Sequence, residues 1–121
     1  MPISIVSIPV SDPDRAKEFY LDVMDFALLR ESPMGPDMRW IQLQPKDGGS
    51  TITLVTWFES MPPGTQQGLM LHVADIDAER DRLISKGVDV PEILEEPWGR
   101  YVMIKDPDGN GWVVVTQPVL D

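Results

Sequence analysis

The chain begins with a strand pattern that changes into a helical one. Residues 2–10 are rich in isoleucine and valine, as in a short buried strand. Asp12 then offers a favourable helix N-cap, and Pro13 suits the first helical position, where its missing N–H has no helical partner. The next apolar side chains recur at helical spacing and form one face: Ala16, Phe19, Tyr20, Val23 and Met24. The pattern predicts a strand followed by an amphipathic helix.

Three further apolar stretches in the first half predict strands, at about 26–31, 38–44 and 51–58. Asp47-Gly48 is typical of a tight hairpin turn and separates the last two of them. The segment 59–67 contains two prolines and a glycine among polar residues and has the character of a linker. The first half therefore predicts one strand, one helix and three strands.

The second half follows the same order. Residues 68–73 are strand-like, and Asp75 follows as a second N-cap. The spacing predicts a helix over 76–86, whose inward residues are Ile76, Leu83 and Ile84. Short strands are predicted at about 88–90, 99–105 and 111–117, with a hairpin turn at 106–110.

Two sets of matched residues indicate an internal repeat. The start of the first helix returns 63 residues later, with Val73, Asp75 and Asp77 in place of Val10, Asp12 and Asp14. The third strand returns 61 residues later, with Arg100-Tyr101-Val102 in place of Arg39-Trp40-Ile41. The repeat predicts an α+β fold built from two βαβββ modules.

These modules are expected to form a single domain over 1–121. The first covers about 1–59, a linker covers about 60–67, and the second covers about 68–121. One module is too small to bury both faces of its sheet. We therefore expect the helices to lie outside and the inner faces to form one curved mixed β-sheet around a cavity.

Composition excludes several functional classes. The 121 residues are 42% hydrophobic and 25% charged, which is typical of a globular protein. A net charge of −10 argues against nucleic acid and against an anionic membrane surface as partners. The absence of cysteine and the single histidine exclude disulfides, zinc sites built on sulfur and multi-histidine cages. No apolar run reaches the roughly 20 residues of a membrane span, so we expect a cytoplasmic protein.

Three motifs resemble one family. The run Val10–Tyr20 (VSDPDRAKEFY), the pair Arg39-Trp40 and the turn Asp106–Asn110 (DPDGN) are similar to signatures of the vicinal oxygen chelate superfamily. That superfamily contains glyoxalase I, bleomycin-resistance proteins and extradiol dioxygenases. The resemblance covers nearly the whole chain and implies paired βαβββ modules, a small-molecule ligand and a homodimer.

The metal ligands of that family are not carried by this chain. The resemblance implies a His or Gln on the first strand of each module and a Glu on the last. The matching positions hold Ile5, Gly68, Val113 and, in the first module, Thr53 or Ile52. None of these offers more than a hydroxyl to a divalent ion. Glyoxalase and dioxygenase reactions need the metal, so we expect no metal cofactor and a metal-independent binding function.

Strand alternation assigns side chains to the two faces of the sheet. Ile41, Leu43, Val102 and Ile104 are expected to face the helices, and Ile5, Ser7, Val113 and Val115 the cavity. The cavity face is also expected to carry the ligand-binding residues Trp40, Gln42, Thr53, Trp57, Met70, His72, Tyr101 and Met103. Such an aromatic and apolar wall suits an apolar, aromatic or cationic ligand.

Other interpretations of these residues remain open. His72 and Tyr101 could act as the acid–base pair of a lyase or isomerase, or the chain could be a dioxygenase with a non-standard metal site. Trp40, Trp57 and Tyr101 could instead fill the cavity of an interaction domain or lie in a dimer contact. The acidic run over 92–96 is predicted to be a solvated loop.

Overall fold

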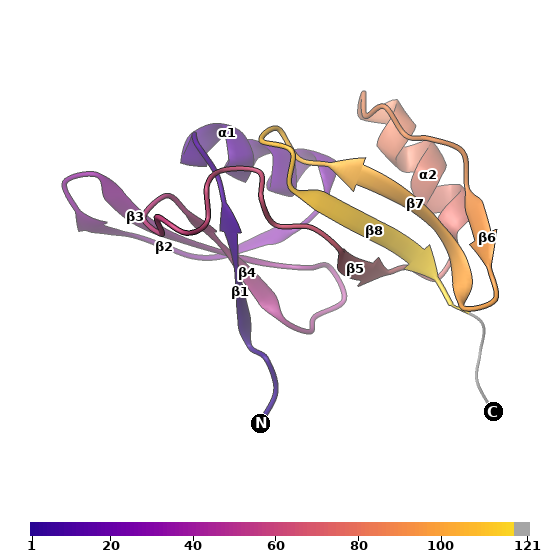
Figure 1. Cartoon of the computed structure of the whole chain (residues 1–121), viewed down its shortest axis with the longest axis horizontal. Coiled ribbons are helices and arrows are strands. Elements are labelled where there is room, and N and C mark those ends of the chain that lie inside the picture. Colours follow the sequence, from indigo (N-terminus) through magenta and orange to yellow (C-terminus); the bar gives the residue numbers. More distant parts are fainter. Residues whose placement is uncertain (118–121) are drawn as a thin grey trace. The chain divides into compact units, whose positions relative to one another are not determined.

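The computed structural model describes residues 1–117 and divides them into two compact units. The first unit contains residues 1–66 together with the turn 106–110. The second contains residues 67–105 and, among the described residues, 111–117. Each unit holds one four-stranded mixed sheet and one helical segment (Figure 1).

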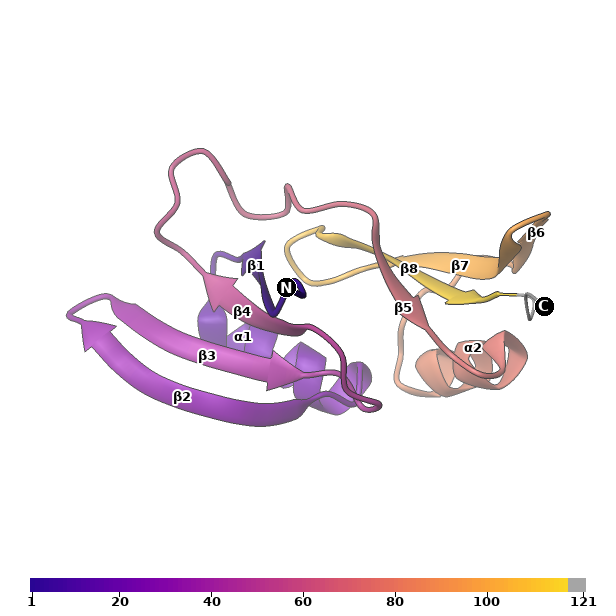
Figure 2. The same cartoon turned by 90° about the horizontal axis from the view of Figure 1, so that it is seen from below.

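The sheet of the first unit has the strand order β1-β4-β3-β2. β1 and β4 are parallel, whereas β4, β3 and β2 are antiparallel neighbours. The helical segment covers one face of this sheet (Figure 2). The elements are β1 (Ile5–Pro9), α1 (Pro13–Glu18), the π-helical turn η1 (Phe19–Val23), β2 (Ala27–Gly35), β3 (Met38–Gln44) and β4 (Thr51–Val55).

The second unit has the same topology. Its strand order is β5-β8-β7-β6, with β5 parallel to β8 and the other pairs antiparallel. The predicted repeat of two βαβββ modules is therefore confirmed. The elements are β5 (Leu69–His72), α2 (Ile76–Ser85), β6 (Leu94–Glu96), β7 (Gly99–Lys105) and β8 (Gly111–Thr116). No helix formed by residues 1–117 is long and apolar enough to cross a membrane.

Both predicted N-caps are present. One carboxylate oxygen of Asp12 accepts hydrogen bonds from the backbone N–H groups of Asp14 and Arg15, at 3.1 and 3.2 Å. The carboxylate of Asp75 accepts from Asp77 and Ala78 in the same way, at 3.0 and 3.2 Å. Each aspartate satisfies donors that the first helical turn would otherwise leave unpaired.

An arginine in the first unit joins its helix to two strands. Arg39 lies in β3, and its Nη2 is 2.6 Å from Oδ1 of Asp14 in α1. Its Nε is 3.1 Å from Oε2 of Glu31 in β2. The hydrogen bond from Arg39 lowers the pKa of the exposed Asp14 carboxyl below its ordinary value, and the charge of Arg39 adds to this shift.

The second unit repeats this arginine contact at the matching positions. Arg100 lies in β7, and its Nη1 is 2.9 Å from Oδ2 of Asp77 in α2. Its Nε is 3.0 Å from Oε1 of Glu95 in β6. The hydrogen bond from Arg100 lowers the pKa of the Asp77 carboxyl. The residues that match between the two halves of the sequence therefore also form corresponding ion pairs in the two units.

The cores lie between each sheet and its helix. Ile41 and Leu43 of β3 are fully buried, and Val102 and Ile104 of β7 are buried at the matching positions. These four residues are the ones that alternation assigned to the helix side. Alternation therefore predicted the buried face of the third strand in both modules.

A buried carboxylate organises the turn between β7 and β8. Asp106 is 5% exposed, and its Oδ2 accepts hydrogen bonds from the Tyr20 hydroxyl and from Nδ2 of Asn110, both at 2.8 Å. Its Oδ1 accepts from the backbone N–H groups of Asp108 and Asn110, both at 2.9 Å. Nδ2 of Asn110 also donates to the carbonyl oxygen of Pro9, at 2.8 Å. The turn is thereby tied to β1 and to η1 of the first unit.

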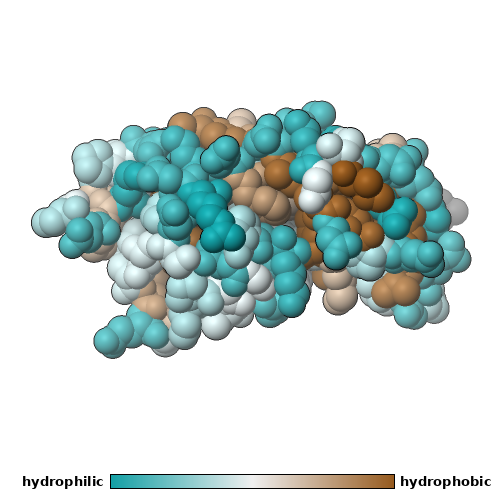
Figure 3. Space-filling model, turned by 90° about the horizontal axis from the view of Figure 1, so that it is seen from above, coloured by the Kyte–Doolittle hydropathy of each residue, from teal (hydrophilic) through white to brown (hydrophobic). Residues whose placement is uncertain are grey.

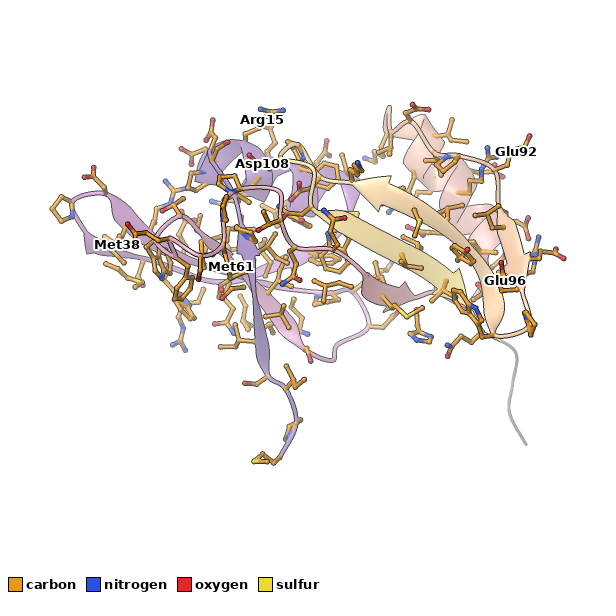
Figure 4. All side chains as sticks on the ribbon, in the orientation of Figure 1. Arg15, Met38, Met61, Glu92, Glu96 and Asp108 are labelled. Atoms are coloured by element: carbon orange, nitrogen blue, oxygen red, sulfur yellow. The ribbon has the colours of Figure 1, made fainter. Side chains whose placement is uncertain are left out.

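The outer side of the same turn contacts the start of α1. Oδ1 of Asp108 accepts hydrogen bonds from the backbone N–H and the hydroxyl of Ser11, at 3.1 and 2.6 Å. Nη2 of Arg15 donates to the carbonyl oxygen of Pro107, at 3.3 Å. Figure 4 shows Arg15 and Asp108 close together beside α1.

The predicted linker is held by specific contacts within the first unit. The backbone N–H of Gln66 donates to Oδ1 of Asn110, at 3.0 Å, and its Nε2 donates to the carbonyl oxygen of Ser7, at 3.1 Å. Gly64 has a φ of +84°, and a Cβ at this position would collide with the backbone carbonyl of Asp108. Glycine is therefore required there both for its conformation and for the close approach.

Three local predictions were wrong. The short strand of the second module is β6 at 94–96, where a solvated acidic loop was expected, and no strand forms at 88–90. Val90 instead buries its side chain, so the apolar residues of that segment cover the core. Figure 4 places Glu92 and Glu96 along this edge of the second unit. Ile84 is 45% exposed, because it lies one residue beyond the buried Leu83 and faces outward.

The third difference concerns the first helix. The predicted continuous amphipathic helix changes at Phe19 into the π-helical turn η1, in which the backbone N–H of Met24 donates to the carbonyl oxygen of Phe19, at 3.2 Å. The wider turn buries Tyr20 and Met24 but leaves Phe19 and Val23 half-buried. Tyr20 is thereby directed to Asp106.

We predict that Asp106→Ala destabilises the protein by about 2–4 kcal/mol, because it leaves the buried Tyr20 hydroxyl and Asn110 amide without this acceptor. Urea denaturation followed by circular dichroism measures the change. Asp81→Ala, at an exposed aspartate of α2, is the matched control and should change stability by less than about 0.5 kcal/mol. Equal denaturation midpoints for the two variants would contradict the role given to Asp106.

The Asp14 carboxyl should titrate at a higher pH in Arg39→Gln than in the wild type, because its main pKa-lowering partner is removed. The pKa of Asp14 is lower in the native protein than in the unfolded chain, so the ion pair contributes its full stabilisation of the native state above the unfolded-state pKa. Its contribution is lost as the pH falls through the native pKa. Carboxyl chemical shifts in NMR report the midpoint. Arg100→Gln is the control: it should raise the midpoint of Asp77 and leave that of Asp14 unchanged.

Candidate ligand-binding site

Two of the predicted cavity residues of the first unit, Trp40 and Gln42, form side-chain hydrogen bonds along the sheet. Nε1 of Trp40 donates to Oε1 of Gln42, at 3.3 Å, and Nε2 of Gln42 donates to the hydroxyl of Thr51, at 2.9 Å. Thr53 lies opposite Gln42 in the sheet and is 1% exposed. The indole N–H of Trp40 and the amide of Gln42 are thus engaged within the sheet, and Thr53 is buried.

Trp57 lies at a different place in the first unit. It follows β4 and contributes to a cavity of about 310 Å³ at the end of the sheet beside α1 and the β2–β3 hairpin. Met38, next to the Arg39 of the ion pairs, lies on the same hairpin (Figure 4). The cavity is lined by Pro13, Pro33, Gly35, Pro36, Asp37, Met38, Arg39, Leu54, Thr56 and Trp57.

The second unit carries a larger and more apolar groove. Its volume is about 500 Å³, within the range of ligand pockets. The register places Met70 and Met103 on either side of Val113, so these side chains form one row across β5, β8 and β7. The six residues that line the groove are Met70, Trp98, Tyr101, Met103, Val113 and Gln117.

Two stacked aromatic rings form one wall of this groove. The ring centroids of Trp98 and Tyr101 are 4.7 Å apart, and their planes meet at 20°. Trp98 is the second residue of the two-residue turn between β6 and β7, and it is 44% exposed. At the adjacent Gly99, a Cβ would lie 2.9 Å from Cγ2 of Val115, so a side chain there would displace β8. Glycine at position 99 therefore permits the close approach of β7 and β8 next to Trp98.

The groove is chemically suited to a flat, largely uncharged molecule. None of its six lining side chains is charged, and Gln117 supplies the only amide among them. An aromatic ligand can stack on an exposed ring in offset or edge-to-face geometry. Methionine side chains are flexible and polarisable, so they adapt to the outline of a ligand. The arrangement can therefore desolvate an apolar body and orient it through a few polar groups, those of Gln117, Tyr101 and Trp98.

His72 is not among the residues that line the groove. It pairs with Val115, and Val115 pairs on its other side with Tyr101. The backbones of His72 and Tyr101 are thus two strand spacings apart, about 9–10 Å. The structure gives no hydrogen bond between these two side chains, and the register does not support them as a directly coupled acid–base pair.

The positions where a family metal would be expected do not fit a divalent ion. Ile5 and Thr53 lie in strands of the first unit, and Gly68 and Val113 belong to the second. Only Thr53 has a donor atom in its side chain, and it is buried. Within residues 1–117 no group of three or more His, Asp or Glu side chains is placed to hold a metal ion.

Two groove residues were missed by the sequence interpretation. Trp98 lies in a turn, where strand alternation assigns no face, and Gln117 follows the end of β8. The signal available for Trp98 was its place directly after Pro97 and before Gly99, which is typical of a tight hairpin. On the face drawn in Figure 3, hydrophobic residues gather over the second unit, and the surface over the first unit is mainly hydrophilic.

These observations define an α+β protein of paired βαβββ modules with an apolar groove. The model of the Glyoxalase/Bleomycin resistance protein/Dioxygenase superfamily matches residues 3–114. The chain belongs to this superfamily.

Its relatives span the full length of the fold. The crystal structure of TnmS3, an antibiotic binding protein from Streptomyces sp. CB03234, is 41% identical with a TM-score of 0.92 and covers 98% of this chain and 97% of that one. A glyoxalase/bleomycin resistance protein from the same organism is 43% identical with a TM-score of 0.84, over 93% and 97% of the two chains. The YetH protein of Bacillus subtilis (strain 168) is 32% identical over 115 residues, 89% of this chain and 92% of YetH.

Proposed function

We propose that this protein binds a flat, largely uncharged aromatic small molecule in the groove of its second unit, without a metal ion. The stacked pair of Trp98 and Tyr101 at the groove carries the proposal, because it offers a large exposed ring surface beside apolar side chains. The similarity to TnmS3, whose structure is described as that of an antibiotic binding protein, supports a small-molecule ligand of this kind.

The donor set supports the metal-independent form of the proposal. The four family positions offer one buried hydroxyl between them, which is a poor ligand for a divalent ion. The separation of His72 from Tyr101 gives no support to the lyase or isomerase alternative. The homodimer that the family resemblance implies remains a prediction.

The role of Trp98 can be tested with N-phenyl-1-naphthylamine, an uncharged aromatic dye whose fluorescence rises in apolar surroundings. We expect saturable binding to the wild type. Trp98→Ala should weaken binding about 10-fold or more, since loss of an aromatic stack and its buried area is worth about 1–3 kcal/mol. Titration of dye fluorescence at constant protein concentration gives both dissociation constants.

Trp57→Ala is the matched control, because Trp57 lines the separate cavity of the first unit. It should change the affinity for the dye by less than about 3-fold. A wild type that shows no saturable binding would refute the proposed function for this ligand class. If Trp57→Ala loses as much affinity for the dye as Trp98→Ala does, the assignment of the binding site to the groove is wrong.

Metal ions should have no effect on this protein. The unfolding temperature should stay constant when Ni²⁺, Co²⁺, Mn²⁺, Zn²⁺ or Fe²⁺ is added, since an ion that binds the native state must raise it. The dissociation constant of the dye should also be the same with and without EDTA. A saturable rise of several degrees with one ion would overturn the metal-independent function and favour the catalytic alternative.

A further inference from the structure

Two exposed methionines form part of the groove. Met70 in β5 is 45% exposed and Met103 in β7 is 57% exposed. Both lie directly opposite Val113 of β8, so their side chains project from the same face of the sheet on either side of one valine. Both line the groove. The two methionine side chains are therefore part of the surface that a ligand would contact, and they are exposed to solvent.

An accessible thioether reacts with peroxides. A lone pair of the sulfur attacks one oxygen of hydrogen peroxide, the O–O bond breaks, and the departing hydroxide takes the proton of the transferred oxygen to form water. The sulfur loses two electrons and becomes a sulfoxide, and the peroxide is reduced. The product is polar and chiral, and methionine sulfoxide reductases return it to the thioether.

We propose that Met70 and Met103 make the groove an oxidation-sensitive site, in which sulfoxide formation stops binding of the aromatic ligand and a bound ligand protects both sulfurs. The inference rests on the proposed function. A sulfoxide oxygen is a strong hydrogen-bond acceptor, and a ligand that covered it would remove it from water without replacing its partners. The donors among the six lining residues are the Gln117 amide, the Tyr101 hydroxyl and the Trp98 indole N–H, and Met70, Met103 and Val113 supply none, so two sulfoxides would place polar groups in the apolar part of the groove.

The other methionines provide internal comparisons. Met24 is 4% exposed and should resist oxidation. Met34 in β2 is 45% exposed, the same fraction as Met70, but it belongs to the first unit and does not line the groove. It should be oxidised at a similar rate, with no effect on binding and no protection by the ligand.

The test combines peptide mass spectrometry with dye binding. Wild-type protein is treated with hydrogen peroxide, with and without N-phenyl-1-naphthylamine, and the sulfoxide content of each methionine is followed over time. We expect Met70 and Met103 to be oxidised before Met24, and the dye to slow their oxidation severalfold but not that of Met34. The affinity for the dye should fall about 10-fold or more, and methionine sulfoxide reductase should restore it.

Two variants assign the effect to the groove. In Met70→Leu/Met103→Leu the dissociation constant should be the same before and after peroxide treatment, whatever its starting value. In Met34→Leu peroxide should lower the affinity as much as in the wild type. Met103→Gln places a polar group of similar length in the groove without any oxidant and should also weaken binding. Circular dichroism verifies that each treated protein keeps its fold.

The outcomes separate this inference from the proposed function. If untreated wild type does not bind the dye, the proposed function is refuted and the inference falls with it. If the wild type binds the dye and still binds it unchanged with both sulfoxides formed, or if Met103→Gln binds as the wild type does, only the inference is refuted. A loss of affinity on peroxide treatment of Met70→Leu/Met103→Leu would also refute the inference, because it would assign the effect to another residue.

Discussion

Asp106 is almost fully buried, so its carboxylate accepts hydrogen bonds from protein groups in place of bulk water. Much of the structure follows from these hydrogen bonds. The two carboxylate oxygens accept from one tyrosine hydroxyl, one asparagine amide and two backbone N–H groups of the same turn. These bonds define the turn between β7 and β8, and the turn of a hairpin sets the register of its strands. The register then places Met103 opposite Val113 and Tyr101 opposite Val115. The groove therefore depends on a buried carboxylate that is itself not part of it.

The parts of the fold that could be predicted from the sequence are those with local and repeated signals. The aspartate caps at Asp12 and Asp75 need only their own helices, and both are present. The match of Asp14 with Asp77 and the match of Arg39 with Arg100 were part of the predicted repeat, and in the structure Asp14 pairs with Arg39 and Asp77 with Arg100. Alternation also placed the buried residues of the third strands, because those strands have neighbours on both sides.

The missed features have a local sequence signal that also suits another structure. β6 has an acidic composition that is typical of a loop, and it becomes a strand only because a two-residue turn folds it onto β7. The π-helical turn has no distinct pattern, since its apolar positions also suit an α-helix. Of the eight residues proposed for the site, Met70, Tyr101 and Met103 line the groove of the second unit, whereas Trp57 lines the other cavity. Trp98 was missed because it lies between strands.

The position of Trp98 has a consequence for exchange of molecules with the groove. The ring is carried by a hairpin whose outer strand has three residues, lies at the edge of its sheet and is paired on one side only. Such short edge hairpins open at a small fraction of the free energy of global unfolding. The Trp98 ring can consequently move away from Tyr101 and return while β5, β7 and β8 keep their pairing. For the ligand proposed above, entry and release would then depend on local opening of this one hairpin and not on the stability of the whole fold.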